Sequence, residues 1–307
     1  MDGETSQGYS DLFVVKFAPD GTRQWTRQLG GTSDEYASFI AVDAQGNVLV
    51  LGYTYGELPG QVSHGASDMV LARLAADGTL HWARQLGTST YDYARAVAAD
   101  ADGNAYLVGN TSGRVGGDAT VGGNDVVLLK LDPNGAVEWG RQTGSTSDDY
   151  AGGVTVDAGG NVYVAGTTYG ALEGDASAGD SDLFLMRFSS EGVRAWTRQV
   201  GGSSYEWTSG VAVDAGGNVY LSGSTESALG GPADRNGNAL LVSYSADGAR
   251  RWTQQVGTTG SDWSGGVAAA GNSVYLVGGT EGTLDGQASF GGTDSFVTRF
   301  GADGVRE

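Results

Sequence analysis

The chain has 307 residues, of which 54 are glycine, 39% are hydrophobic and none is cysteine. Its net charge of −19 excludes the basic surface that nucleic-acid binding needs and disfavours an anionic membrane surface. Without cysteine, disulfides, thiolate metal sites and thiol nucleophiles are excluded as well. No apolar run is long enough to cross a bilayer, and Met1 to Glu4 lack the basic and apolar regions of a signal peptide.

Each part of the chain predicts the same four short strands, illustrated here by the first copy. The first strand is expected at 12–17, and a Pro-Asp-Gly turn follows it, in which Gly21 can adopt a positive φ. The second strand is expected around 24–28, the third at 36–42 and the fourth at 48–51. No stretch keeps a helical period, so we expect almost no helix.

A repeat of about 57 residues, the spacing shared by tryptophans and turn glycines, runs through the chain. The tryptophans stand in the second strand of each unit, at Trp25, Trp82, Trp139, Trp196 and Trp252. We therefore expect a single domain spanning 1–307. Its units are 11–67, 68–124, 125–181, 182–237 and 238–293, with a partial unit at 294–307.

Repeats of this length with four antiparallel strands are typical of an all-β protein, the β-propeller, with a solenoid as the second choice. The third strand carries small residues, so we place it innermost. Five blades are favoured, closed by 11–29 joining 263–277, which leaves the final strand at 295–300 surplus. Six blades with incomplete terminal blades, or a piece of a longer array, are the alternatives.

The unit also resembles a known family, the SBBP-type β-propeller repeat of bacterial and some myxobacterial extracellular proteins. The resemblance rests on Asp182-Leu-Phe-Leu-Met-Arg-Phe, Trp196-Thr-Arg-Gln and Val211-Ala-Val-Asp. It covers nearly the whole chain but implies an architecture rather than an activity. The spacing from Gly135 to Trp139 is similar to the tryptophan-docking motif of quinoprotein propellers, which implies an outer tryptophan packed against a neighbouring blade. With the acidic composition, the family implies an extracellular or cell-surface location.

An aspartate at the start of the first strand recurs together with an arginine in the second strand. If Phe13 faces Arg27 across the hairpin, the two charged side chains share one face. The fifth copy changes both residues, to Asn238 and Gln254, as expected if they touch. We therefore predict a structural ion pair in four units: Asp11–Arg27, Asp68–Arg84, Asp125–Arg141 and Asp182–Arg198.

A further aspartate recurs in the turn before the fourth strand, for example in Asp100-Ala-Asp102-Gly-Asn104. This oxygen-rich turn raises Ca²⁺ as a cofactor, but it lacks the glycine spacing and the distal glutamate of an EF-hand. Side-chain capping of the turn explains the aspartate better. We expect no metal site and no other cofactor.

An acid followed by an aromatic residue precedes or opens the third strand of every unit. This combination suits a sugar, because the ring stacks on C–H groups while the carboxylate accepts hydrogen bonds from hydroxyls. The alternative is that the aromatic packs between blades and the acid caps the loop. The candidate ligand-binding pairs are Glu35-Tyr36, Asp92-Tyr93, Asp149-Tyr150, Glu206-Trp207 and Asp262-Trp263.

Catalysis is not expected from these residues. The two histidines, His64 and His81, do not recur, and acyl-transfer triads are excluded. The sequence predicts a non-catalytic binding or scaffold module that recognises a protein or glycan through the loops flanking the third and fourth strands. A purely structural repeat module of a larger surface protein is the alternative. A carboxylate-based hydrolase comes third, because the evenly recurring acids form no unique acid/base pair.

Overall fold

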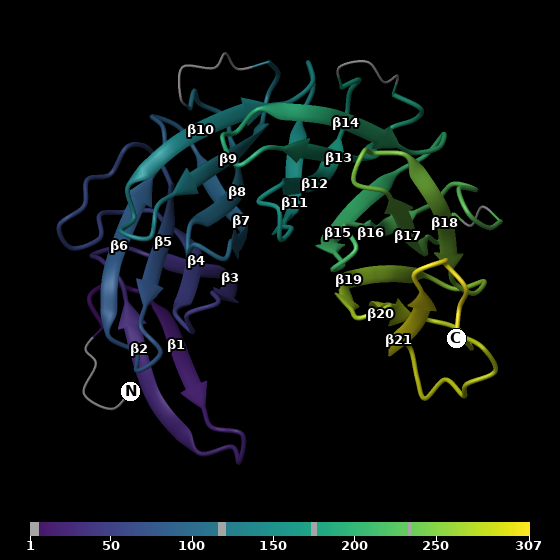
Figure 1. The fold of residues 1–307 in the computed structure, drawn as a ribbon, viewed down its shortest axis with the longest axis horizontal. Helices are drawn as coiled ribbons and strands as arrows, with labels where there is room; N and C mark the ends of the chain where they lie inside the picture. Colours follow the sequence, from purple (N-terminus) through teal and green to yellow (C-terminus); the bar gives the residue numbers. More distant parts are fainter. Residues whose placement is uncertain (1–5, 116–120, 173–176, 233–234) are drawn as a thin grey trace. The chain divides into compact units, whose positions relative to one another are not determined.

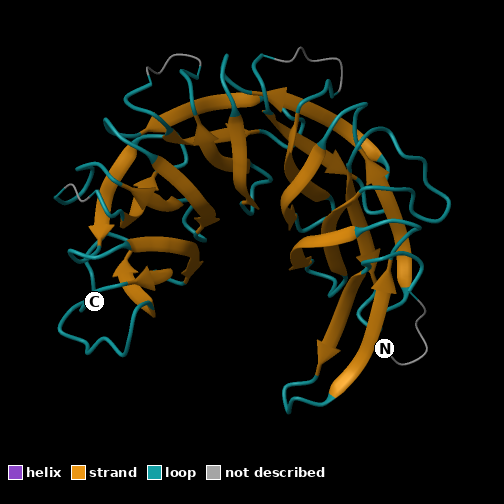
Figure 2. Ribbon diagram, turned by 180° about the vertical axis from the view of Figure 1, so that it is seen from behind, coloured by secondary structure: helices purple, strands orange, loops and turns teal. Residues whose placement is uncertain are grey.

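The computed structural model describes residues 6–115, 121–172, 177–232 and 235–307. Over these ranges the protein consists of twenty-one β-strands joined by turns and loops, with no helix (Figure 2). The chain divides into two compact units, Met1–Thr143 and Gly144–Glu307, which we describe in turn.

The first unit contains a two-stranded hairpin and two four-stranded antiparallel sheets (Figure 1). The hairpin is β1 (Leu12–Phe17) with β2 (Arg23–Leu29). The first full sheet comprises β3 (Glu35–Val42), β4 (Val48–Thr54), β5 (Asp68–Leu74) and β6 (Leu80–Leu86). The second comprises β7 (Asp92–Ala99), β8 (Ala105–Thr111), β9 (Asp125–Leu131) and β10 (Val137–Thr143).

The second unit contains two four-stranded sheets and one of three strands. The four-stranded sheets are β11 (Asp149–Val156), β12 (Val162–Thr168), β13 (Asp182–Phe188), β14 (Arg194–Val200), and β15 (Glu206–Val213), β16 (Val219–Thr225), β17 (Asn238–Tyr244), β18 (Arg250–Val256). The three-stranded sheet is β19 (Asp262–Ala270), β20 (Ser273–Thr280) and β21 (Asp294–Gly301).

Within each sheet, every strand pairs with the next one along the chain, which is the meander of a propeller blade. The predicted all-β architecture and its strand order are confirmed. The final strand, expected to be surplus, instead pairs along its whole length with β20, from Ser273 opposite Gly301 to Thr280 opposite Asp294. The first sheet has two strands and the last has three, and such incomplete terminal sheets are the alternative that the sequence left open.

Apolar cores lie between neighbouring sheets of each unit. In the first unit, Leu49, Leu71 and Leu107 are fully buried in one cluster that joins β4, β5 and β8. In the second unit, Leu185 of β13 and Leu221 of β16 belong to a corresponding cluster. The middle strands are buried on both faces, which explains why they read as continuous apolar runs rather than as alternating patterns.

Two kinds of β-bulge recur and set the positions of the candidate site side chains. The first lies in the hairpin of β1 and β2, where Lys16 faces Trp25 but Phe17 faces Arg23. The second lies in the first strand of each later sheet, here called the inner strands: β3, β7, β11, β15 and β19. In β7, Ala94 pairs with Gly109 and Ala96 with Val108, so that Arg95 is the extra residue. A bulge re-aims one side chain and shifts the pairing beyond it by one residue.

Candidate functional site

The predicted Asp–Arg ion pairs are wrong, because the bulge shifts the hairpin register by one residue. Phe13 faces Gln28 instead of Arg27. Consequently a glutamine, not an arginine, donates to the aspartate, with Nε2 to Oδ2 distances of 2.7 Å for Gln85 and Asp68 and 2.6 Å for Gln199 and Asp182. The correction applies to Asp11–Arg27, Asp68–Arg84, Asp125–Arg141 and Asp182–Arg198, whose acids bond Gln28, Gln85, Gln142 and Gln199.

The arginines bind the turn of the following repeat instead. Arg84 Nε donates to the carbonyl of Gly135 over 2.8 Å, and Arg198 Nε donates to that of Gly248 over 2.7 Å. In the fifth repeat Gln254 Nε2 keeps this contact, to Gly304 over 2.9 Å. The joint change to Asn238 and Gln254 therefore affects two separate contacts.

The tryptophans of the outer strands dock on the same turns. Trp82 Nε1 donates to the carbonyl of Pro133 over 2.9 Å, and Arg84 lies over the Trp82 ring at 5.6 Å from its centre. The ring lies on Gly135, where φ is +80° and a methyl group would be 2.7 Å from it. Trp25, Trp196 and Trp252 make the equivalent contacts within their units, with Gly78, Gly248 and Gly304, while Trp139 packs on Tyr106.

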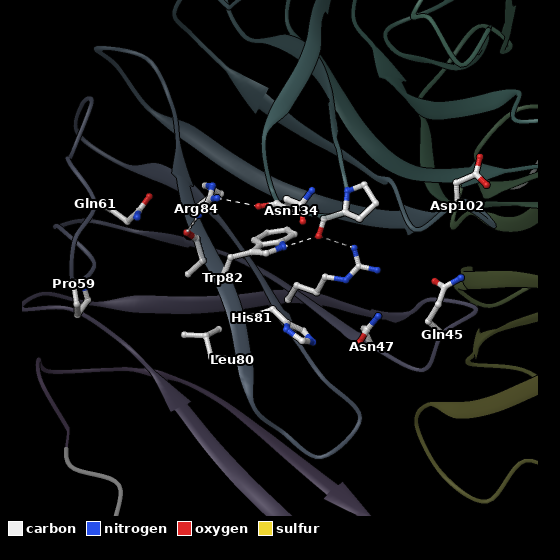
Figure 3. Close-up of a pocket in the computed structure, with 13 residues that line it drawn as sticks. Gln45, Asn47, Pro59, Gln61, Leu80, His81, Trp82, Arg84, Asp102 and Asn134 are labelled. Carbon is white, nitrogen blue, oxygen red and sulfur yellow. Dashed lines mark hydrogen bonds between the residues drawn. The ribbon is translucent and has the colours of Figure 1, made fainter.

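A cavity of about 850 Å³ lies beside this docking site in the first unit (Figure 3). Its walls include Arg73, His81, Trp82 and Arg84. Arg73 forms a buried ion pair with Asp43 and also donates to the carbonyl of Pro133 over 3.2 Å. Its two arginine side chains, Arg73 and Arg84, thus hold neighbouring turns together.

The acids of the candidate pairs are buried and hold loops closed. Glu35 and Asp262 are 2% exposed, and the other three acids are fully buried. Each accepts a hydrogen bond from a backbone N–H four residues earlier, at 2.9 Å from Gly31 to Glu35 and 2.8 Å from Gly202 to Glu206. The same bond forms from Thr88 to Asp92, from Ser145 to Asp149 and from Thr258 to Asp262. None of these carboxylates is placed to meet a ligand.

In the second unit, the aspartate that opens β13 and the acid that opens β15 are close neighbours. A methyl group on Gly201 would lie 1.7 Å from Asp182 Oδ1 and 2.6 Å from Glu206 Oε2. Burial, and further the Asp182 charge, raise the pKa of Glu206 above its usual value. Burial likewise raises the pKa of Glu35 and of Asp92. In the last repeat Asn238 takes the place of the first acid, so that pair carries at most one charge.

The aromatic partners point the other way, toward solvent. Tyr36 is 43% exposed, Trp207 42% and Trp263 39%. Tyr93 and Tyr150 are half-buried. The structure therefore separates the predicted pairs: the acid stabilises the loop in all five, whereas the aromatic ring is exposed in Tyr36, Trp207 and Trp263.

In the first unit two of these aromatics, Tyr36 and Tyr93, belong to a tyrosine cluster that also contains Tyr53, Tyr55 and Tyr91. Tyr36 stacks on Tyr53 with ring centres 5.3 Å apart, and the Tyr93 ring meets the Tyr53 ring edge-on at 5.2 Å. A hydrogen bond with Tyr93, together with burial, raises the pKa of Tyr55 to about 12. A pocket of about 440 Å³ opens beside Tyr53 and Tyr93.

The turn aspartates cap their own turns. Asp100 Oδ1 accepts from the backbone of Asp102 and Asn104, at 3.0 and 2.9 Å, and Oδ2 accepts from the Asn104 side chain. Burial opposes ionisation at the equivalent Asp157, but hydrogen bonds from Asn161 hold the pKa of Asp157 below its usual value. Among the described residues, no group of three or more histidine or acidic side chains is arranged to hold a metal ion.

Repeated four-stranded antiparallel meanders define the class of β-propeller repeat proteins. The family described as the SBBP β-propeller repeat matches residues 24–59, 81–114, 138–172 and 195–230. The chain is therefore an SBBP β-propeller repeat protein, as the sequence resemblance implied.

Similar proteins extend this picture to a longer relative and to known folds. The chain is 30% identical over 234 residues to the regulatory protein FlaEY of Caulobacter vibrioides. The match covers 68% of this chain and 24% of FlaEY, so the chain spans about a quarter of that protein's length.

Among solved structures, the Pan2 WD40 domain of Neurospora crassa matches with a TM-score of 0.52 and 10% identity, over 88% of this chain and 64% of that one. A puromycin hydrolase S511A mutant in complex with PGG matches at 0.54 and 13%, over 97% and 41%. At these identities the likeness concerns the fold alone. No helix within the described ranges is long and apolar enough to cross a membrane.

Proposed function

We propose that this propeller is a non-catalytic binding module that recognises a protein or a glycan through the aromatic side chains at the start of its inner strands. One observation carries the proposal: three rings of the tyrosine cluster are exposed, whereas the recurring tryptophans of the outer strands pack on neighbouring turns. Tyr36, Tyr55 and Tyr91 are 43%, 43% and 51% exposed.

The chemistry of the cluster suits recognition. Tyrosine offers a large rigid apolar face and a hydroxyl at its tip, and it is enriched where proteins meet their ligands. Five such rings in mutual contact form a preorganised surface, so little side-chain entropy is lost on binding. The small Ala37 and Ser38, both exposed, let a ligand approach the backbone.

The buried acids support a binding role rather than hydrolysis. A carboxylate-based hydrolase needs an acid and a base at the surface that meets its substrate. Here the recurring acids at the start of the inner strands accept hydrogen bonds from loop amides and are at most 2% exposed. An extracellular or cell-surface location belongs to the same proposal, and it rests on the family resemblance and the acidic composition.

A double variant, Tyr36→Ala with Tyr91→Ala, tests the proposal on glycan and peptide arrays. We expect array binding to fall by at least about tenfold, a loss of about 1.4 kcal/mol. Tyr9→Ala is the matched control, because Tyr9 is 90% exposed and lies outside the cluster. Unchanged binding by a correctly folded double variant would favour the purely structural alternative.

A further inference from the structure

Arg95 is the charged exception at a position that is otherwise small and neutral. It is the extra residue of the bulge in β7, between Ala94 and Ala96. The bulges of the other inner strands hold Ser38, Gly152, Ser209 and Gly265 at this place. A bulge re-aims its extra side chain, and bulges are over-represented next to active sites.

The Arg95 side chain lines the pocket next to the tyrosine cluster. The pocket has a volume of about 440 Å³, and Ala37, Ser38, Tyr53, Tyr93, Ala94 and Arg95 line it. This size lies in the range of small-molecule sites. Arg95 is its one charged lining residue, a cation within a chain whose net charge is −19.

The guanidinium is held in place but leaves most of its donors open. Arg95 Nε donates to Asn110 Oδ1 over 3.2 Å, and Asn110 is itself 2% exposed. Within the described residues the terminal nitrogens of Arg95 have no hydrogen bond or ion pair. A guanidinium presents paired donors that match the two oxygens of a carboxylate.

The tyrosines supply the second half of the site. Tyr53 and Tyr93 both line the pocket, and their rings meet edge to face. The pKa of Tyr55, raised to about 12, keeps that neighbouring phenol neutral at physiological pH. A ligand that carries both a carboxylate and a ring with axial C–H groups would use the arginine and an aromatic face together.

We propose that the Arg95 pocket binds the carboxylate-bearing ring of an acidic sugar, such as a terminal uronate. The carboxylate lies on the terminal nitrogens of Arg95, and the pyranose ring stacks on Tyr53 or Tyr93. This inference rests on the proposed binding function and names its ligand class. A ligand with a single acidic sugar unit fits better than a polyanionic polysaccharide, because the negative net charge of the protein repels a densely charged chain.

The test compares a glucuronate-terminated trisaccharide with its glucose-terminated counterpart by calorimetric or NMR titration. We expect the wild-type protein to prefer the acidic sugar and Arg95→Ser to lose about tenfold in its affinity, with the neutral sugar unaffected. Arg95→Ser introduces the residue that occupies the equivalent bulge position in β3, Ser38. Arg250→Ser is the control, since it removes an exposed arginine from β18 and changes the net charge equally.

Separate outcomes distinguish this inference from the proposed function. If Arg95→Ser binds both sugars as the wild type does, while Tyr36→Ala with Tyr91→Ala loses binding, the arginine assignment is overturned and the binding module stands. If the wild type binds neither sugar but binds a peptide through the tyrosine cluster, the sugar assignment fails alone. Equal losses in Arg95→Ser and Arg250→Ser would show a general charge effect and also overturn it.

Discussion

Every repeat has two prominent aromatic positions, and they have opposite surroundings. In four repeats the tryptophan of the outer strand donates its N–H to a carbonyl of the next turn and lies on a glycine, as Trp82 does on Gly135. The aromatic that opens or follows the start of the inner strand keeps two fifths of its surface in solvent in Tyr36 and Trp207. Recurrence at a fixed spacing therefore shows that a position belongs to the repeat. Only its contacts distinguish an aromatic residue that packs against a neighbouring repeat from one that is exposed.

The largest effect should come from filling the space under a docked tryptophan. Gly135→Ala is expected to destabilise the protein by about 3 kcal/mol or more, because a methyl group would lie 2.7 Å from the Trp82 ring at a φ of +80°. Gly21→Ala has nearly the same φ, +83°, but nothing within 4 Å, and should cost about 1 kcal/mol. Urea unfolding followed by tryptophan fluorescence measures both, and equal losses would contradict the docking argument.

A comparable contrast separates the tryptophans from each other. Trp196→Ser should cost about 3 kcal/mol, since it removes a ring packed on Tyr163 and Gly248. Trp207→Ser should change stability by about 0.5 kcal/mol or less, because surface substitutions remove little packing. Unfolding of the two variants side by side gives the answer, and a large loss in Trp207→Ser would mean that this ring is structural.

The neighbouring acids predict a smaller effect that depends on pH. The pKa of Glu206 is raised in the folded protein, so its contribution to stability is full below about pH 4 and is lost as the pH rises through the folded pKa. Asp182→Asn removes the neighbouring charge and offers an N–H to Glu206. We expect about 1 kcal/mol of added stability at pH 7, with no gain at pH 4.

The chain provides the reciprocal variant. Asn238→Asp creates a second carboxylate beside Asp262, and a methyl group on Gly257 would lie 1.7 Å from the first and 3.0 Å from the second side chain. This variant should be less stable at pH 7 by about 1 kcal/mol and recover as the pH falls. Stability curves that stay parallel to that of the wild type across pH 4–8 would argue against interaction between the two side chains.

Comparison between repeats predicted the period, the strands and the position of the outer tryptophans, because these features recur. It failed for the Asp–Arg pairs, since a bulge between the turn and Trp25 changes which of Arg27 and Gln28 faces Phe13, and no residue type marks that bulge. It also passed over Tyr53 and Arg95, which occur in single repeats. A repeat pattern reveals the scaffold and hides departures from it, and such departures are where a ligand preference would be encoded.

The docking of Trp25, Trp82, Trp196 and Trp252 on the turn of the following repeat gives the array a direction. Trp252 donates to the carbonyl of Ala302 over 3.0 Å, and its ring lies on Gly304. The short segment 294–307 thus supplies the turn on which the tryptophan of the preceding repeat docks. If one or more complete repeats are inserted or deleted, each docked tryptophan still meets an equivalent turn in the repeat that follows it. A chain of this kind can change its repeat number by recombination and still keep this contact between neighbouring repeats.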